Sequence, residues 1–164
     1  MIFISNILKR DDHLTTYTDL LIEADNNNLI TKEKCLLAHK GRIKGNRIAI
    51  KKDMTTAEKA CVLAEELGHY YTATGDILDM SKTENRKLEN KGRIVAYNKL
   101  IGLSGLVDVY KNHCSTVYEA SECLNVPEDF FCDALSYYKS KYGDYAIYEN
   151  YIIIFEPNLA IINI

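Results

Sequence analysis

Two carboxylates and one imidazole stand close together near the middle of the chain and could bind a metal ion. Glu65 and His69 are four residues apart, which places them on one side of a helix, and Glu66 lies about 100° further round. Carboxylate and imidazole side chains are both ligands of zinc and related divalent ions. The spacing therefore predicts a helix that presents two metal ligands with a further acidic group beside them.

This arrangement matches the metal-binding helix of zinc peptidases. There two ligands at positions i and i+4 bind the metal, and the glutamate after the first ligand acts as general base toward the attacking water. The usual sequence is His-Glu-x-x-His, whereas this chain has Glu-Glu-Leu-Gly-His, so Glu65 stands where histidine is expected. A carboxylate ligand lowers the Lewis acidity of the metal and shifts the preference toward harder ions. An ordinary charged helix without a metal is the alternative interpretation.

The ends of this helix are indicated by local signals. Thr55 and Glu58 have the spacing of a capping box, so the helix is expected to begin there, and Gly75 is suited to its C-terminal end. Apolar residues at three- and four-residue spacing predict the buried face, namely Ala60, Ala64, Leu67 and Tyr71.

A second helix is predicted to supply another carboxylate. Ser81 and Glu84 form a second possible capping box, and the helix should run to about Ile101. Glu89 lies on it beside a strip of small and apolar residues.

Glu89 needs a partner if it points inward, because an unpaired buried charge costs several kcal/mol. A metal held by the first helix would be such a partner. Arg86 or Arg93 would be the alternative.

The remaining N-terminal segments read as a scaffold. Asp11 and Asp12 could cap an amphipathic helix that stops at the asparagines 26–28. Residues 35–38 and 47–50 predict a small antiparallel sheet. Basic residues gather around it; they are interpreted as a solvated edge, with a patch for phosphate or an acidic partner as the alternative.

The run from Leu63 to His69, the Thr-x-x-Gly-Asp that begins at Thr72, and Glu89-x-x-Gly92-x-x-x-Ala96 together resemble the ImmA/IrrE family of metallopeptidases. The resemblance is strongest to members from phages and mobile elements of low-GC bacteria. It implies an α+β, zincin-like metallopeptidase domain of helices with a small antiparallel sheet.

The same resemblance implies roles for individual residues. His69 and Glu89 would be metal ligands, Glu65 would occupy the first ligand position, and Glu66 would be the catalytic general base. The implied cofactor is Zn²⁺, with Mn²⁺ or another divalent ion as the alternative.

The rest of the chain is expected to form an appendage. Residues 1–103 would be the metallopeptidase domain. Residues 104–143 would form a helix-turn-helix-like unit, with Pro127 at the first position of its second helix. Residues 144–164 would form a β-hairpin that turns at Glu149 and Asn150, followed by a packed tail. From Lys111 to Lys141 three lysines stand against five acidic residues, a net charge of 3 − 5 = −2, which disfavours contact with nucleic acid.

Composition restricts the location and the partners. The net charge of −3 argues against general affinity for nucleic acid or anionic membranes. The five cysteines form no Cys-x-x-Cys pair, and their odd number does not suit a disulfide framework. The start lacks the pattern of a secretory signal, and no stretch has the roughly 18 to 20 apolar residues of a membrane span. These features predict a cytoplasmic protein.

Two functions from different classes follow from the sequence. The first is a metal-dependent endopeptidase that resembles antirepressors and cleaves a phage-type repressor, with Tyr70, Tyr71 and Tyr97 as candidate oxyanion donors. The alternative is a non-catalytic, zincin-like protein that binds a repressor or antitoxin without cleaving it. A regulator that acts through the helix-turn-helix is disfavoured by its charge.

Overall fold

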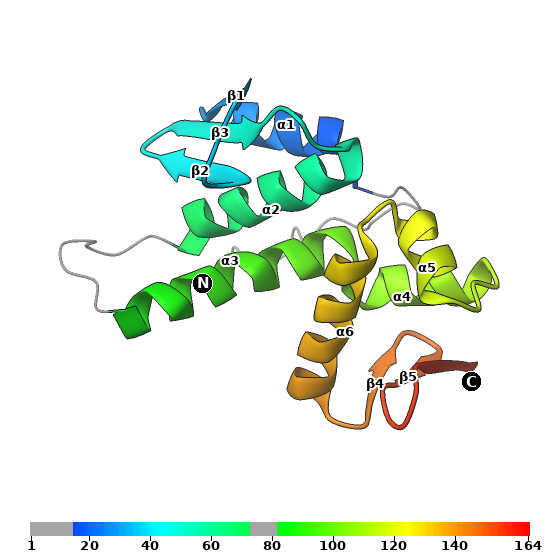
Figure 1. Ribbon diagram of the computed structural model, residues 1–164. Coiled ribbons are helices and arrows are strands. Elements are labelled where there is room, and N and C mark those ends of the chain that lie inside the picture. The colour runs from blue at the N-terminus through cyan, green and yellow to red at the C-terminus, as the bar shows by residue number, and fades with distance from the viewer. Residues whose placement is uncertain (1–14, 73–81) are drawn as a thin grey trace, which may run out of the picture.

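A mixed α+β fold is formed by residues 15–72 and 82–164, which the computed structural model describes (Figure 1). In chain order its elements are α1 (Tyr17–Asn26), β1 (Ile30–Lys34), β2 (Gly41–Lys44), β3 (Arg47–Lys51), α2 (Thr56–Thr72), α3 (Lys82–Leu100), α4 (Gly102–Lys111), α5 (Val117–Leu124), α6 (Glu128–Tyr142), β4 (Tyr145–Tyr148), β5 (Tyr151–Ile154) and β6 (Ala160–Asn163). The predicted fold class is confirmed. None of the described helices is both long and apolar enough to cross a membrane.

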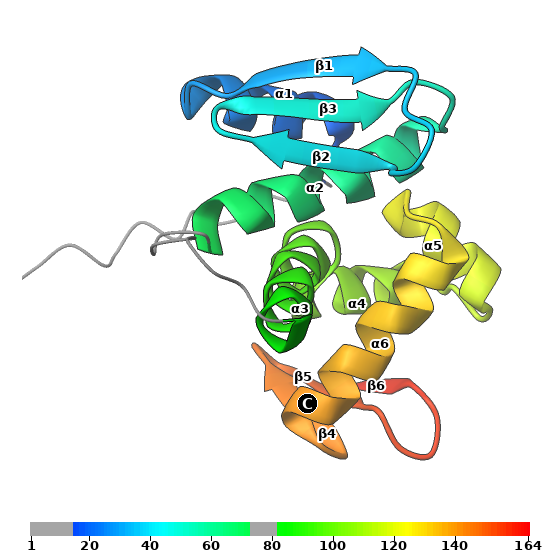
Figure 2. The same ribbon diagram turned by 60° about the vertical axis from the view of Figure 1, so that its left-hand side comes forward.

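Helix α2 lies at the centre of the N-terminal half. The sheet of β1, β2 and β3 and helix α1 lie on one side of it, and α3 lies on the other (Figure 2). Its inward residues Ala60, Leu63, Ala64 and Leu67 are all buried, as the apolar spacing predicts. Tyr71, also predicted on the buried face, is 38% exposed, because its hydroxyl group donates a hydrogen bond to Glu23 at 2.7 Å on the surface.

The predicted helix start at Thr55 is confirmed by hydrogen bonds. The Glu58 backbone N–H donates to the Thr55 hydroxyl at 3.2 Å, and the Thr55 backbone N–H donates to the Glu58 carboxylate at 2.9 Å. Helix α1 begins after a capping box of Thr16 and Asp19 and ends at Asn26, with Asn27 as its C-cap, both within the predicted asparagines. The other predicted boundary residues, Asp11, Asp12, Gly75 and Ser81, lie outside the described residues.

The first sheet differs from its prediction in one strand. β2 and β3 are antiparallel as expected, but β1 pairs with the other side of β3 in parallel, which gives the order β1-β3-β2. Residues 35–38 are not a strand; they belong to the loop between β1 and β2, where Leu37 is fully exposed. The strand lies just before them, in the polar run Ile30–Lys34, whose pairing with β3 outweighs its weak β-propensity.

The helix-turn-helix-like segment follows its predicted order. A capping box of Thr116 and Glu119 starts α5, Asn125 ends it with a left-handed backbone (φ 50°), and α6 follows. Pro127 is the residue just before α6 and not its first helical residue. Helix α6 buries Phe131, Ala134 and Tyr138.

Tyr138 connects α6 to the junction of α3 and α4 by two hydrogen bonds. Its side chain is fully buried, and its hydroxyl group accepts a hydrogen bond from the Gly102 N–H at 3.0 Å and donates one to the Tyr97 carbonyl at 2.9 Å. Gly102 has a φ of +61°, a left-handed conformation that favours glycine, and the Tyr138 hydroxyl group accepts the hydrogen bond of its N–H.

Tyr138→Phe is expected to lower the free energy of unfolding by about 1 to 3 kcal/mol, because the partly buried Gly102 N–H loses its acceptor and the Tyr97 carbonyl group loses its donor. Urea unfolding followed by circular dichroism measures the change. The matched control is Tyr118→Phe, whose ring is 61% exposed, and its unfolding free energy should stay within about 0.5 kcal/mol of the parent. Equal effects of the two changes would contradict the role of the Tyr138 hydroxyl group.

The C-terminal hairpin is confirmed, with β4 and β5 antiparallel and joined at Glu149 and Asn150. The apolar tail forms a third strand, since β6 pairs antiparallel with β5. The division at residues 103 and 143 stays a prediction. Buried residues from all three segments, among them Leu67, Phe131 and Ile153, belong to one core cluster.

Candidate metal centre

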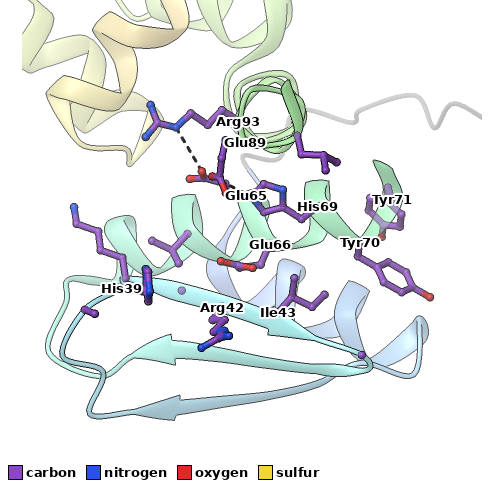
Figure 3. A pocket seen from close by; sticks show the side chains of 16 residues that line it. His39, Arg42, Ile43, Glu65, Glu66, His69, Tyr70, Tyr71, Glu89 and Arg93 are labelled. Atoms are coloured by element: carbon purple, nitrogen blue, oxygen red, sulfur yellow. Dashed lines mark ion pairs between the residues drawn. The ribbon is translucent and has the colours of Figure 1, made fainter. Parts of the chain in front are cut away.

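Glu65, His69 and Glu89 converge between α2 and α3 (Figure 3). One possible ligand atom from each of the three side chains lies within 4.8 Å of the other two. Nε2 of His69 lies 3.7 Å from Oε2 of Glu89. The structure therefore brings together the three residues that the sequence predicts as ligands, and their role as ligands stays a prediction.

Two glycines let the helices come close enough for this convergence. A Cβ atom added to Gly68 would lie 2.6 Å from the Gly92 carbonyl oxygen and 2.9 Å from its Cα atom. A Cβ atom added to Gly92 would lie 2.6 Å from Cε1 of His69. The backbones of α2 and α3 are thus in contact, and the imidazole lies over Gly92. Glu89, nearly one turn before Gly92, can therefore reach His69.

Glu66 lines the same pocket as the three converging residues, and its side chain points from α2 toward β2 (Figure 3). Its side chain is 8% exposed, and its carboxylate accepts a hydrogen bond from the Ile43 backbone N–H. The pKa of Glu66 is raised to about 7, mainly by burial and also by the nearby Glu65 charge, while the Ile43 hydrogen bond opposes the rise. A Cβ atom added to Gly41 would lie 2.8 Å from Oε1 of Glu66, so this position on β2 makes room for the carboxylate.

Arg93 pairs with Glu65, the residue that departs from the usual motif. Nε of Arg93 lies 3.5 Å from Oε1 of Glu65. Burial raises the pKa of Glu65, and the Arg93 guanidinium opposes that rise. Arg93 was considered above as a partner of Glu89, but the structure pairs Glu89 with His69 instead. The Arg86 side chain lies outside the described residues.

The donor set fits a divalent metal. Two carboxylates and one imidazole are suitable ligands for Zn²⁺, and hard carboxylates also suit Mn²⁺. In tetrahedral geometry with bonds of about 2.0 to 2.2 Å, neighbouring ligand atoms lie about 3.4 Å apart. The ligand atoms lie within 4.8 Å of one another, and the 3.7 Å between His69 and Glu89 is close to this value.

The cluster opens into a pocket of about 1140 Å³. One wall is formed by β2 and the residues before it, including His39, Lys40 and Arg42, and Tyr70 and Tyr71 lie at another part of the lining. Tyr97 lines a neighbouring, smaller cavity. The β2 residues were not predicted at the site, because the apolar residues 35–38 had been expected to form the strand. Arg93 could have been found from the sequence, because it lies four residues after Glu89 and therefore on the same side of α3.

Together the helix-borne carboxylate and imidazole, the second-helix carboxylate and the open pocket define a metallopeptidase-like domain. The family model Peptidase_M78, described as the IrrE N-terminal-like domain, matches residues 20–136. This is more than half of the chain, so the protein belongs to the ImmA/IrrE family, which confirms the resemblance noted in the sequence. No curated protein and no solved structure matches the chain.

Proposed function

We propose that the protein is a metal-dependent endopeptidase whose substrate is a phage-type repressor encoded close to its own gene. The observation that carries this proposal is the convergence of Glu65, His69 and Glu89 in an open pocket, with Glu66 directly beside them. The three converging residues would hold a divalent metal, Zn²⁺ or Mn²⁺. When bound, that ion supplies Lewis acidity toward the water and the scissile carbonyl group.

Glu66 acts as the general base in this proposal. It takes a proton from the attacking water and later delivers a proton to the leaving amine. A raised pKa suits this task, because a base with a pKa close to the working pH both accepts and releases a proton readily. The Ile43 N–H fixes the direction of the carboxylate while leaving it beside the pocket.

Two kinds of residue would position the substrate and stabilise charge. Tyr70 lines the pocket and could donate a hydrogen bond to the oxyanion. Tyr71 lines it too, but its hydroxyl group donates its proton to Glu23 in the structure. Arg93 orients Glu65 through their ion pair, as residues behind a metal ligand commonly do.

The proposal is tested by incubating the purified protein with the neighbouring repressor in the presence of Zn²⁺ or Mn²⁺. Mass spectrometry should find two fragments that sum to the repressor, and a chelator should stop their formation until metal is restored. A repressor that is bound but stays intact under every metal condition would favour the non-catalytic binder, the alternative that keeps the same fold. Elemental analysis of the protein gives the metal content independently.

Glu65→His is expected to tighten zinc binding about tenfold and to weaken the preference for Mn²⁺, because imidazole is the softer ligand. Competition with a chromophoric chelator measures both affinities. Glu65→Gln is the matched control, since it removes the charge that pairs with Arg93 without adding a ring nitrogen, and it should bind zinc more weakly than the parent. Identical zinc affinity in all three proteins would show that Glu65 is not a ligand.

A further inference from the structure

The outer face of the first sheet carries only basic and apolar residues. In β1, β2 and β3 alternate residues face away from α2, and the strand registers place eight residues on that side. Two are apolar, Ile30 and Ala49. The other six form what we call the basic face: Lys32, Lys34, Arg42, Lys44, Arg47 and Lys51. None of these six forms an ion pair within 4.0 Å with another described residue.

The basic face holds like charges directly opposite each other. Lys34 is the register partner of Lys51, and Lys44 is the register partner of Arg47. Like charges in such positions destabilise a sheet. Lysines on edge strands protect against aggregation, which would explain the basic residues of the edge strands β1 and β2. That explanation does not cover Arg47 and Lys51, because they lie on the central strand β3. An anionic partner would relieve the repulsion on all three strands.

The basic face is continuous with the candidate metal centre. Arg42 belongs to the basic face and also lines the pocket that contains Glu66 and His69. It lies on β2, which is an edge strand next to α2 (Figure 3). A chain that lies across the basic face therefore passes over β2 into the pocket.

We propose that the basic face docks an acidic segment of the polypeptide substrate, outside the peptide bond that is cleaved. This inference rests on the proposed function and adds to it a substrate class: a protein with an acidic stretch flanking the cleavage site. The docking would raise the local concentration of the scissile segment at the pocket.

A polypeptide fits this face better than nucleic acid does. Apart from the six basic residues the chain has 20 − 6 = 14 basic and 23 acidic residues, a remainder of −9. Strands of five residues span only about 17 Å. A DNA duplex, stiff over about 50 nm, would extend beyond the basic face across the acidic remainder of the surface. A flexible acidic peptide can stay on the face and bend into the pocket.

The test measures binding of a short fluorescent oligoglutamate peptide by anisotropy at low and at physiological salt, using metal-free protein. The decisive variant is Lys34→Glu with Lys44→Glu. Each change converts a like-charge register pair into an opposite-charge pair, so the sheet is expected to stay folded while the basic face loses four units of charge. The control is Lys87→Glu with Lys91→Glu, which makes the same change of charge at exposed positions on α3, on the other side of α2.

We expect the parent protein to bind oligoglutamate with an affinity that falls as salt rises. The Lys34/Lys44 variant should bind about tenfold more weakly or worse, and the Lys87/Lys91 variant within about twofold of the parent. No binding by the parent, equal losses in both variants, or tighter binding of a DNA duplex than of oligoglutamate at the same salt would each overturn the proposal. Glu66→Gln should bind oligoglutamate as the parent does, so failure of cleavage and failure of docking are separate outcomes.

Discussion

Glu66→Gln is expected to reduce the rate of repressor cleavage by about 10²- to 10⁴-fold while metal affinity stays close to that of the parent. The reason is that glutamine keeps the size of the side chain and can still accept the Ile43 hydrogen bond, but it cannot take a proton from water. Cleavage is followed by mass spectrometry under single-turnover conditions, and metal affinity by chelator competition.

Glu122→Gln is the matched control, because it makes the same chemical change at an exposed position on α5. It should cleave at the rate of the parent. If Glu66→Gln also lost its metal, Glu66 would belong to the group of ligands and not beside it. Unchanged cleavage in Glu66→Gln would remove the general base from the mechanism.

Gly92→Ala is expected to weaken metal binding by about 100-fold, at the upper end of the losses seen when residues behind metal ligands are changed. The added methyl group would lie 2.6 Å from Cε1, 2.8 Å from Nδ1 and 2.9 Å from Nε2 of His69, so the imidazole ring must leave its place. The loss should appear in zinc titrations at a temperature where circular dichroism shows that the variant is folded.

Two further glycine variants distinguish displacement of the imidazole ring from separation of α2 and α3. In Gly68→Ala the new methyl group would meet the Gly92 backbone at 2.6 Å, so it should push α2 and α3 apart without touching the imidazole. It should lower the free energy of unfolding by about 1 to 3 kcal/mol. Gly105→Ala has 3.2 Å to Cδ2 of Leu124, a movable side chain, and should leave metal binding unchanged. Metal affinity of Gly92→Ala equal to the parent would contradict the contact between this glycine and a ligand.

The parts of the site that depend on local sequence could be predicted. Glu65 and His69 face the same way because of helical periodicity, and the capping box at Thr55 depends on residues three apart. Glu89 meets His69 as predicted, but the burial argument for it was wrong, because the Glu89 side chain is 67% exposed. That meeting agrees with the role that the family resemblance implies for Glu89. For Glu65, His69 and Thr55 the decisive physics acts within a few residues.

The other parts depend on contacts between distant segments. The hydrogen bond from the Ile43 N–H to Glu66 depends on where β2 lies. The sequence predicted a strand at the apolar residues 35–38 instead, which are a loop. The strand β1 has a polar sequence and is defined only by its parallel pairing with β3. The sequence suggested Arg93 as a partner of Glu89, and only the packing of α3 on α2 pairs it with Glu65 instead.

Arg93 also connects the metal cluster to the second half of the chain. Its charge acts on Asp133 of α6 as well as on Glu65, and its side chain contacts Tyr97. A protein shortened to residues 1–103 would therefore carry an electrostatically altered site. Without α6, Glu65 would be the one carboxylate left among the described groups that act on the guanidinium. The shortened chain would therefore differ from the 164-residue chain in the charges around Glu65 even with every predicted ligand in place.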